Sequence, residues 1–234
     1  MAEGRAAIAR ARLLGERFLY RVPGSAAPET TGAVEDFDAA AWDALRSEVA
    51  ACTRCELHRT RTQAVFGSGT PRTSFMVIGE APGFHEDQQG EAFVGRGGQL
   101  LTKILEAIGF GRDQVFITNI LKSRPPGNAD PLPHQVAACE PYLARQIELI
   151  GPAVILTLGR HAARTLLGFE GPMASFRGRV FEYRGVPVVA TYHPAALLRN
   201  PGLKRPTWDD VQLARRVYDE RMAGRDGGSG GEKK

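Results

Sequence analysis

The sequence predicts an α/β protein: a three-layer α/β/α sandwich with a central, mostly parallel four-stranded sheet. Short apolar segments alternate along the chain with longer segments whose apolar residues recur at helical spacing. The short segments are apolar throughout, as expected for strands that are buried on both faces. Strands separated by helices form parallel sheets, and function then lies at the carboxyl ends of the strands.

Composition and charge exclude several classes of protein. The chain has 234 residues, of which 43% are hydrophobic, enough for one domain with a full core. No apolar run approaches the roughly 18 to 20 residues that span a bilayer, and the N-terminus lacks a secretory signal. Three cysteines do not suit a disulfide framework. We therefore expect a cytoplasmic protein in which the CxxC pair serves a metal, a cluster or redox chemistry.

The first 37 residues are expected to be an extension and linker, partly disordered. Residues 1–20 are predicted to be a helix, and residues 22–36 form a Pro/Gly/Thr-rich linker without periodicity. The main domain is expected over residues 38–222, opening with Asp38 as the N-cap of a helix over 39–52. Residues 223–234 are expected to form a disordered tail.

The core of that domain follows as an alternation of strands and helices. The segments 74–82, 114–122 and 153–159 are predicted strands. Residues 177–194 are predicted to form a hairpin that turns at Arg184-Gly185 and supplies the fourth strand with its second arm. The predicted helices cover residues 97–110, 134–151, 160–168 and 207–222.

Polar residues follow three of these strands where each one ends. Glu80, Asn119 and His193 are expected to be neighbours, because the carboxyl ends of parallel strands share one crevice. Taken singly, each is more often a turn, cap or loop residue. Their joint placement favours a functional site.

Four motifs together resemble one known family. They are "GEAPGFHED", "GEAFVGRGGQLL", "TNILKSRPPGN" and "YHPAALLRNP". In this order and spacing the chain, from about Cys52 to about Trp208, resembles the family 4 uracil-DNA glycosylases, the iron–sulfur branch of the uracil-DNA glycosylase superfamily. The resemblance implies an enzyme that hydrolyses the N-glycosidic bond of flipped-out deoxyuridine and leaves an abasic site for base-excision repair.

The resemblance also implies roles for single residues. Phe93 would stack on the flipped base, although an ordinary core phenylalanine is the alternative. Asn119 carries a donor and an acceptor on one amide, so it can pair with O4 and N3–H of uracil. His193 would donate to O2 as negative charge builds there.

Other positions of the pocket carry further expectations. The backbone of Glu80, Ala81 and Pro82 would form the turn against the base. Ala81 stands where the best-known branch of the superfamily has an aspartate, so Glu80 is the nearest carboxylate for the catalytic polar role. Glu86 is expected near uracil C5, where it would exclude the thymine methyl group; capping the following helix is the alternative.

A basic segment follows the histidine. The resemblance places Leu197, Leu198 and Arg199 on a loop that enters the DNA minor groove, with apolar wedges that hold a base step open. Arg199, Lys204 and Arg205 would neutralise phosphates. Residues 175–234 carry a net charge of +5, which agrees with a DNA partner, and a surface loop with incidental charge is the alternative.

The cysteines match the family's cluster pattern incompletely. Cys52, Cys55 and Cys139 correspond to three ligands of a 4Fe–4S cluster, and Ser123 occupies the fourth position. Three outcomes are open: a 4Fe–4S cluster with Ser123 or another group on the fourth iron, a 3Fe–4S cluster, or loss of the cluster. In the last case zinc could bind the cysteines with His58 or His134.

Two other functions stay open at this point. One is a non-catalytic or covalent uracil-DNA-binding member of the superfamily, and the other is an iron–sulfur or zinc structural protein with a vestigial pocket. The expected partners are uracil-containing DNA and downstream base-excision-repair enzymes, with no membrane. The protein is expected to be a monomer associated with the nucleoid.

Overall fold

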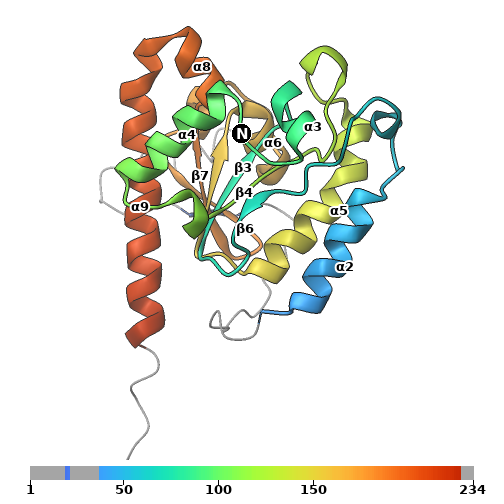
Figure 1. Cartoon of the computed structure of the whole chain (residues 1–234). Coiled ribbons are helices and arrows are strands. Elements are labelled where there is room, and N and C mark those ends of the chain that lie inside the picture. The colour runs from blue at the N-terminus through green and yellow to red at the C-terminus, as the bar shows by residue number, and fades with distance from the viewer. Residues whose placement is uncertain (1–18, 22–36, 228–234) are drawn as a thin grey trace, which may run out of the picture.

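The computed structural model describes residues 19–21 and 37–227, which contain one seven-stranded sheet (Figure 1). The strand order is β1-β6-β7-β5-β3-β4-β2. Its four neighbouring central strands run parallel, which confirms the predicted class. These strands are β3 (Phe75–Gly79), β4 (Phe116–Asn119), β5 (Val154–Leu158) and β7 (Val186–Thr191).

Three short strands extend the sheet beyond the predicted four. β6 (Val180–Tyr183) pairs antiparallel with β7, and β2 (Ser68–Gly69) pairs antiparallel with β4. The hairpin between β6 and β7 turns at Arg184 and Gly185, as predicted. Both residues have positive φ angles, of 49° and 80°, which suit the tight turn of a hairpin.

The first strand corrects the expected N-terminal helix. β1 (Leu19–Arg21) pairs parallel with β6 at the edge of the sheet, so Leu19 and Tyr20 are not helical. An open sheet edge offers unpaired backbone groups, and pairing with it overrides a weak local helical pattern. The rest of the expected helix, residues 1–18, and the expected linker over 22–36 lie outside the described residues.

The helices cover both faces of the sheet and complete the three layers (Figure 1). Along β3, Met76 and Ile78 belong to one core cluster, whereas Phe75 and Val77 belong to the other. The first cluster includes residues of α2 (Ala39–Ala50), α5 (Pro133–Ile150), α6 (Arg160–Leu167) and α7 (Met173–Phe176). The second includes residues of α4 (Arg96–Ala107) and α9 (Lys204–Gly227).

Two helix ends bear on the predicted domain boundaries. α2 begins after Asp38, whose Oδ1 accepts a hydrogen bond of 2.9 Å from the backbone N–H of Ala41, so the predicted N-cap is correct. α9 continues to Gly227, so residues 223–227 are helical and not part of a disordered tail. The Arg225 guanidinium donates to the Gly151 carbonyl at 3.3 Å and thereby holds this last turn against the domain.

Short helices connect the elements around the carboxyl ends of the strands. α3 (Phe84–Gln89) and α8 (Pro194–Arg199) follow β3 and β7. The remaining connections contain the 3₁₀ segments η2 (Glu56–Arg59), η3 (Arg112–Gln114), η4 (Pro126–Asn128) and η5 (Pro201–Leu203). None of the helices in the described part of the chain combines the length and the hydropathy that crossing a bilayer requires.

Candidate active site

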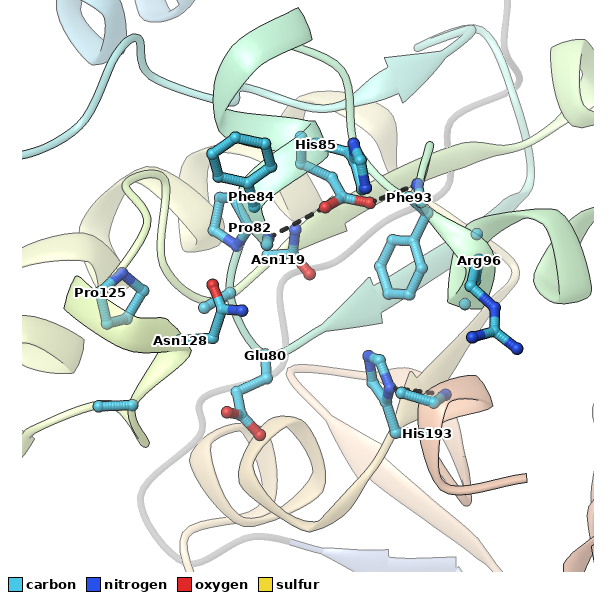
Figure 2. Close-up of a pocket in the computed structure, with 18 of the residues that line it drawn as sticks. Glu80, Pro82, Phe84, His85, Phe93, Arg96, Asn119, Pro125, Asn128 and His193 are labelled. Carbon is cyan, nitrogen blue, oxygen red and sulfur yellow. Dashed lines mark hydrogen bonds between the residues drawn. The ribbon is translucent and has the colours of Figure 1, made fainter. Parts of the chain in front are cut away.

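A cavity of about 610 Å³ opens at the carboxyl ends of β3, β4 and β7 (Figure 2). Glu80, Asn119 and His193 all line it, so the structure brings together the three polar residues that follow these strands in the sequence. The same cavity is lined by other residues that the sequence singled out, namely Ala81, Pro82, Glu86, Phe93 and Arg199.

The ring of Phe93 forms an apolar wall of this cavity. Its backbone has a φ of 57°, a left-handed conformation that aromatic residues rarely adopt. The turn is held against α4 because Gly98 has no side chain. A Cβ at Gly98 would lie 2.8 Å from the Cα of Phe93 and closer still to its carbonyl group. The ring is 5.5 Å from that of His193, centroid to centroid, and only 6% of the residue is exposed.

The amide of Asn119 lies beside the ring, over Gly79. A Cβ at Gly79 would collide with Asn119 Oδ1 and would lie 2.5 Å from Phe93 Cζ, so this position admits no side chain. Asn119 is 1% exposed, and its Oδ1 has no hydrogen-bond partner within the described residues. A buried acceptor left unpaired costs about 1 to 3 kcal/mol, so Oδ1 calls for a ligand that donates a hydrogen bond.

His193 is the N-cap of α8 and is a neutral hydrogen-bond donor. Its Nδ1 accepts from the backbone N–H of Ala195 at 3.2 Å, which leaves the ring proton on Nε2. Burial, together with the neighbouring Arg199 guanidinium, lowers the pKa of His193 to about 4. The imidazole is therefore neutral at physiological pH and offers an N–H donor.

Glu86 holds two turns of the cavity together. Its Oε1 accepts from the backbone N–H groups of Val94 and Gly95, each at 2.9 Å. Its Oε2 accepts from the backbone N–H of Gly83 at 3.1 Å and completes the capping box of α3. Glu86 thus has the capping position that was weighed as an alternative, and it also borders the cavity.

Glu80 belongs to a group of ionisable side chains that sequence reasoning missed. Glu80, Asp130 and His161 each place one ligand-type atom within 4.8 Å of the others, a spacing that could also hold a metal ion. His161 Nε2 lies 3.4 Å from an Asp130 carboxylate oxygen. Burial raises the pKa of Glu80, with His161 opposing this shift. Figure 2 shows the Glu80 carboxylate pointing away from Phe93 and Asn119. The only sequence signal for His161 was its position just after the strand over 153–159.

The basic segment after His193 is helical and not an open loop, which changes the expected wedge. Leu197 is 2% exposed and belongs to the protein core, so it is not available to enter DNA. Leu198 is 42% exposed and remains a candidate wedge. Lys204 is exposed at the start of α9, and the Arg205 Nε lies 3.2 Å from Asp209, which offsets part of its charge.

An exposed aromatic side chain on the rim of the cavity was also missed. Phe84 is 51% exposed, and the Arg124 guanidinium lies 5.1 Å from the centre of its ring. Arg124 is itself held by a bond of 2.7 Å from its Nε to Asn128 Oδ1. No periodicity or motif in the sequence indicated that Phe84 faces solvent.

The three cysteines line a second, separate cavity together with Ser123, His58, Arg61, Lys122 and Tyr142. Burial raises the pKa of the Cys139 and Cys55 thiols. Thiolates on one tetrahedral zinc ion lie about 3.8 Å apart, from Zn–S bonds of about 2.3 Å. Within the part of the chain that the structure describes, the cysteine sulfurs form no set of three within 4.8 Å of one another. This spacing is wider than three thiolates on a single zinc ion require.

At the fourth position of this cavity Ser123 offers a hydroxyl group in place of a thiolate. The Arg61 Nη1 donates to Ser123 Oγ at 2.9 Å. The two histidines considered for zinc have other partners: His134 Nε2 lies 2.9 Å from Glu56, and His58 Nδ1 lies 2.7 Å from the Cys55 carbonyl. His134 does not line the cavity. His58 lines the cavity, and its bond to Cys55 leaves Nε2 available, so the donors around the cavity are three thiols, one hydroxyl and one imidazole.

Comparison with known proteins identifies the family. A family model described as the uracil DNA glycosylase superfamily matches residues 66–213, and the chain belongs to this superfamily. A "Type-4 uracil-DNA glycosylase" of Sulfurisphaera tokodaii is 43% identical over 74% of this chain and 83% of its own length. Proteins of the same name from Archaeoglobus fulgidus and Thermotoga maritima are 44% and 40% identical, over 73% of this chain and over 89% and 91% of their own lengths. The predicted resemblance to the type-4 branch is thereby confirmed.

Proposed function

We propose that the protein is a uracil-DNA N-glycosylase that removes uracil from DNA and leaves an abasic site. The observation that carries this function is the buried Asn119 Oδ1, an acceptor that has no partner among the described residues and borders the cavity. The N3–H group of uracil would supply the missing donor, and the Asn119 amide group would donate to O4. Cytosine presents an acceptor at N3 and a donor at C4, so both bonds would fail.

The reaction follows from the remaining walls of the cavity. A flipped deoxyuridine would stack on Phe93. The C1′–N1 bond breaks with its electron pair moving onto the uracil ring, which leaves a cationic sugar. The Nε2–H of His193 would stabilise the charge that develops on uracil O2, and a neutral imidazole suffices for this. Water then adds to C1′, and the proton that it loses passes through solvent to the released uracil anion. Glu80 is the carboxylate proposed to stabilise the cation and orient that water.

Excision of uracil from a synthetic oligonucleotide tests this proposal. A duplex with one deoxyuridine is incubated with the protein, and alkali then cleaves any abasic site. We expect strand scission with uracil and none with cytosine or thymine at the same position. The Asn119→Ala variant should lose most of the activity while it remains folded. An alkali-stable protein–DNA adduct would support the covalent binder instead, and binding without scission would support the non-catalytic one.

We propose further that Cys52, Cys55 and Cys139 hold an iron–sulfur cluster, with Ser123 at the fourth position. Such a cluster would pin the CxxC segment to α5 and to the segment after β4, and it would take no part in the bond cleavage. Anaerobically purified protein should then show iron, acid-labile sulfide and a broad absorbance band near about 400 nm. A colourless, iron-free protein that excises uracil would refute the cluster and leave the glycosylase function intact.

The partners and location complete the proposal. Arg199 lines the cavity at the end of α8. Arg199, exposed Leu198 on the same helix and exposed Lys204 at the start of α9 are proposed to contact the DNA around the flipped nucleotide. The protein is proposed to act as a monomer on nucleoid DNA in the cytoplasm. The abasic sites that it leaves would pass to downstream base-excision-repair enzymes.

A further inference from the structure

Lys122 is a buried lysine between the cavity of Asn119 and the cavity of the cysteines. It is 2% exposed, and all the hydrogen-bond partners of its Nζ are buried polar groups. Nζ lies 2.7 Å from the main-chain oxygen of Asn119, 2.7 Å from Thr118 Oγ1 and 2.6 Å from Gln146 Oε1. Burying a lysine is costly unless its charge is used, so this arrangement requires an explanation.

All three partners of Lys122 Nζ offer it an oxygen acceptor. The oxygens of Asn119 and Gln146 can only accept, and the Thr118 hydroxyl uses its own hydrogen on the Phe66 carbonyl at 2.9 Å. Nζ is thus the shared donor of three buried acceptors on β4 and α5. None of the three partners is acidic. On the other side, the backbone N–H of Lys122 donates to the thiol of Cys139.

We propose that Lys122 is a positioning residue for uracil recognition, which holds the main chain of Asn119 so that its side-chain amide stays over Gly79. This inference rests on the proposed role of Asn119. β4 ends at Asn119, so the carbonyl that Lys122 holds lies where the sheet ladder stops. Because Nζ bonds at the same time to Asn119, Thr118 and Gln146, it ties the end of β4 to α5, which suits the task of fixing a recognition residue.

The Lys122→Met variant tests this inference because methionine fills a similar volume without a donor. Single-turnover excision, with enzyme in saturating excess over DNA, should fall on the order of tenfold to a hundredfold. Two variants serve as controls. Gln146→Leu disturbs the same buried network but leaves the bond to Asn119, and Lys103→Met removes an exposed lysine from α4. Both should keep the rate within threefold. A loss that is equal in Lys122→Met and Gln146→Leu would overturn the inference, since it would reflect general loosening.

A double-mutant cycle separates positioning from a structural effect. If Lys122 acts through Asn119, Lys122→Met should change the residual rate of Asn119→Ala less than twofold. If the rate loss of the double variant equals the product of the losses of the two single variants, the inference is overturned. An Asn119→Ala variant with full activity would instead contradict the proposed function itself. If Lys122→Met does not fold, Lys122→Gln, with a shorter side chain that still ends in a donor, takes its place in the same cycle.

Discussion

Adding one methyl group at Gly79 should disable the pocket without unfolding the protein. A Cβ there would lie 2.5 Å from Phe93 Cζ, whereas ordinary contacts begin at 3.4 Å, so the ring must withdraw by about 0.9 Å. The Asn119 amide would have to move as well. Both groups would shift into the space that the uracil ring is proposed to occupy. A misplacement of about 1 Å in a catalytic site can cost on the order of 100-fold in rate.

The assay for Gly79→Ala is single-turnover excision from a duplex with one deoxyuridine, measured over a range of enzyme concentrations. We expect kcat/KM to fall about 100-fold, and overpacking to lower the free energy of unfolding by about 1 to 3 kcal/mol. Gly224→Ala is the control, because no atom lies within 4 Å of a Cβ at this position of α9. It should leave the rate unchanged. A Gly79→Ala rate within threefold of the parent would refute the placement of Phe93 and Asn119 at the base.

Three further variants test other parts of the site. His193→Gln should flatten the pH dependence of stability: the folded pKa near 4 lies below the usual 6.5, so the parent loses stability as pH falls from about 6.5 to 4. The ring is not fully shielded from solvent, so we expect a moderate effect. Between pH 7 and pH 4 the parent should lose about 2 to 3 kcal/mol more unfolding free energy than the variant, as measured by urea unfolding. Glu86→Ala should lower uracil excision on the order of tenfold, because three backbone N–H groups lose their acceptor. The variant should not excise thymine; release of thymine would show that Glu86 acts mainly as a steric wall. Asp210→Ala should cost about 3 to 5 kcal/mol of unfolding free energy, since the 1%-exposed Asp210 carboxylate pairs with Arg177 at 2.6 Å and accepts from Thr191 at 2.8 Å. The neighbouring Asp209→Ala, at a 56%-exposed side chain, should stay within about 0.5 kcal/mol of the parent in the same experiment.

The sequence predicted the central sheet because its four parallel strands are apolar on both faces. Such segments have few alternatives, and their order with the helices defines the class. The edge strand β1 was missed, since its partner β6 lies about 160 residues away and its own three residues carry no pattern. Pairing at an edge is a tertiary contact, which local propensity cannot reveal.

The sequence predicted those site residues that directly follow a parallel strand. It did not predict residues whose role depends on which way a side chain points in the folded protein. Asn119 and His193 follow from the convergence of parallel strands. The core position of Leu197 follows only once α8 is known to be a helix with one buried face. The neighbours of Glu80 come from two other connections, Asp130 after η4 and His161 on α6, and no spacing in the sequence joins them.

The segment from Asn119 to Ser123 also explains why a serine at the fourth cluster position is compatible with an intact pocket. Its backbone is held independently of that side chain: Ile120 N–H donates to Gly79, Leu121 N–H donates to Glu80, and Lys122 O accepts from Val65 N–H, at 2.8 to 3.0 Å. Among the described residues, Ser123 Oγ has only the bond from Arg61, a partly exposed side chain that water can solvate instead.

We therefore expect Ser123→Ala to lower the free energy of unfolding by about 1 kcal/mol, the usual value of one hydrogen bond. Excision of uracil should stay within threefold of the parent, because the bonds that place Asn119 do not pass through position 123. Parallel measurements of the excision rate and of urea unfolding decide the matter. A loss of more than tenfold in rate at unchanged stability would show that the cysteine cavity reaches the base pocket through Ser123, and that the backbone bonds alone do not hold Asn119.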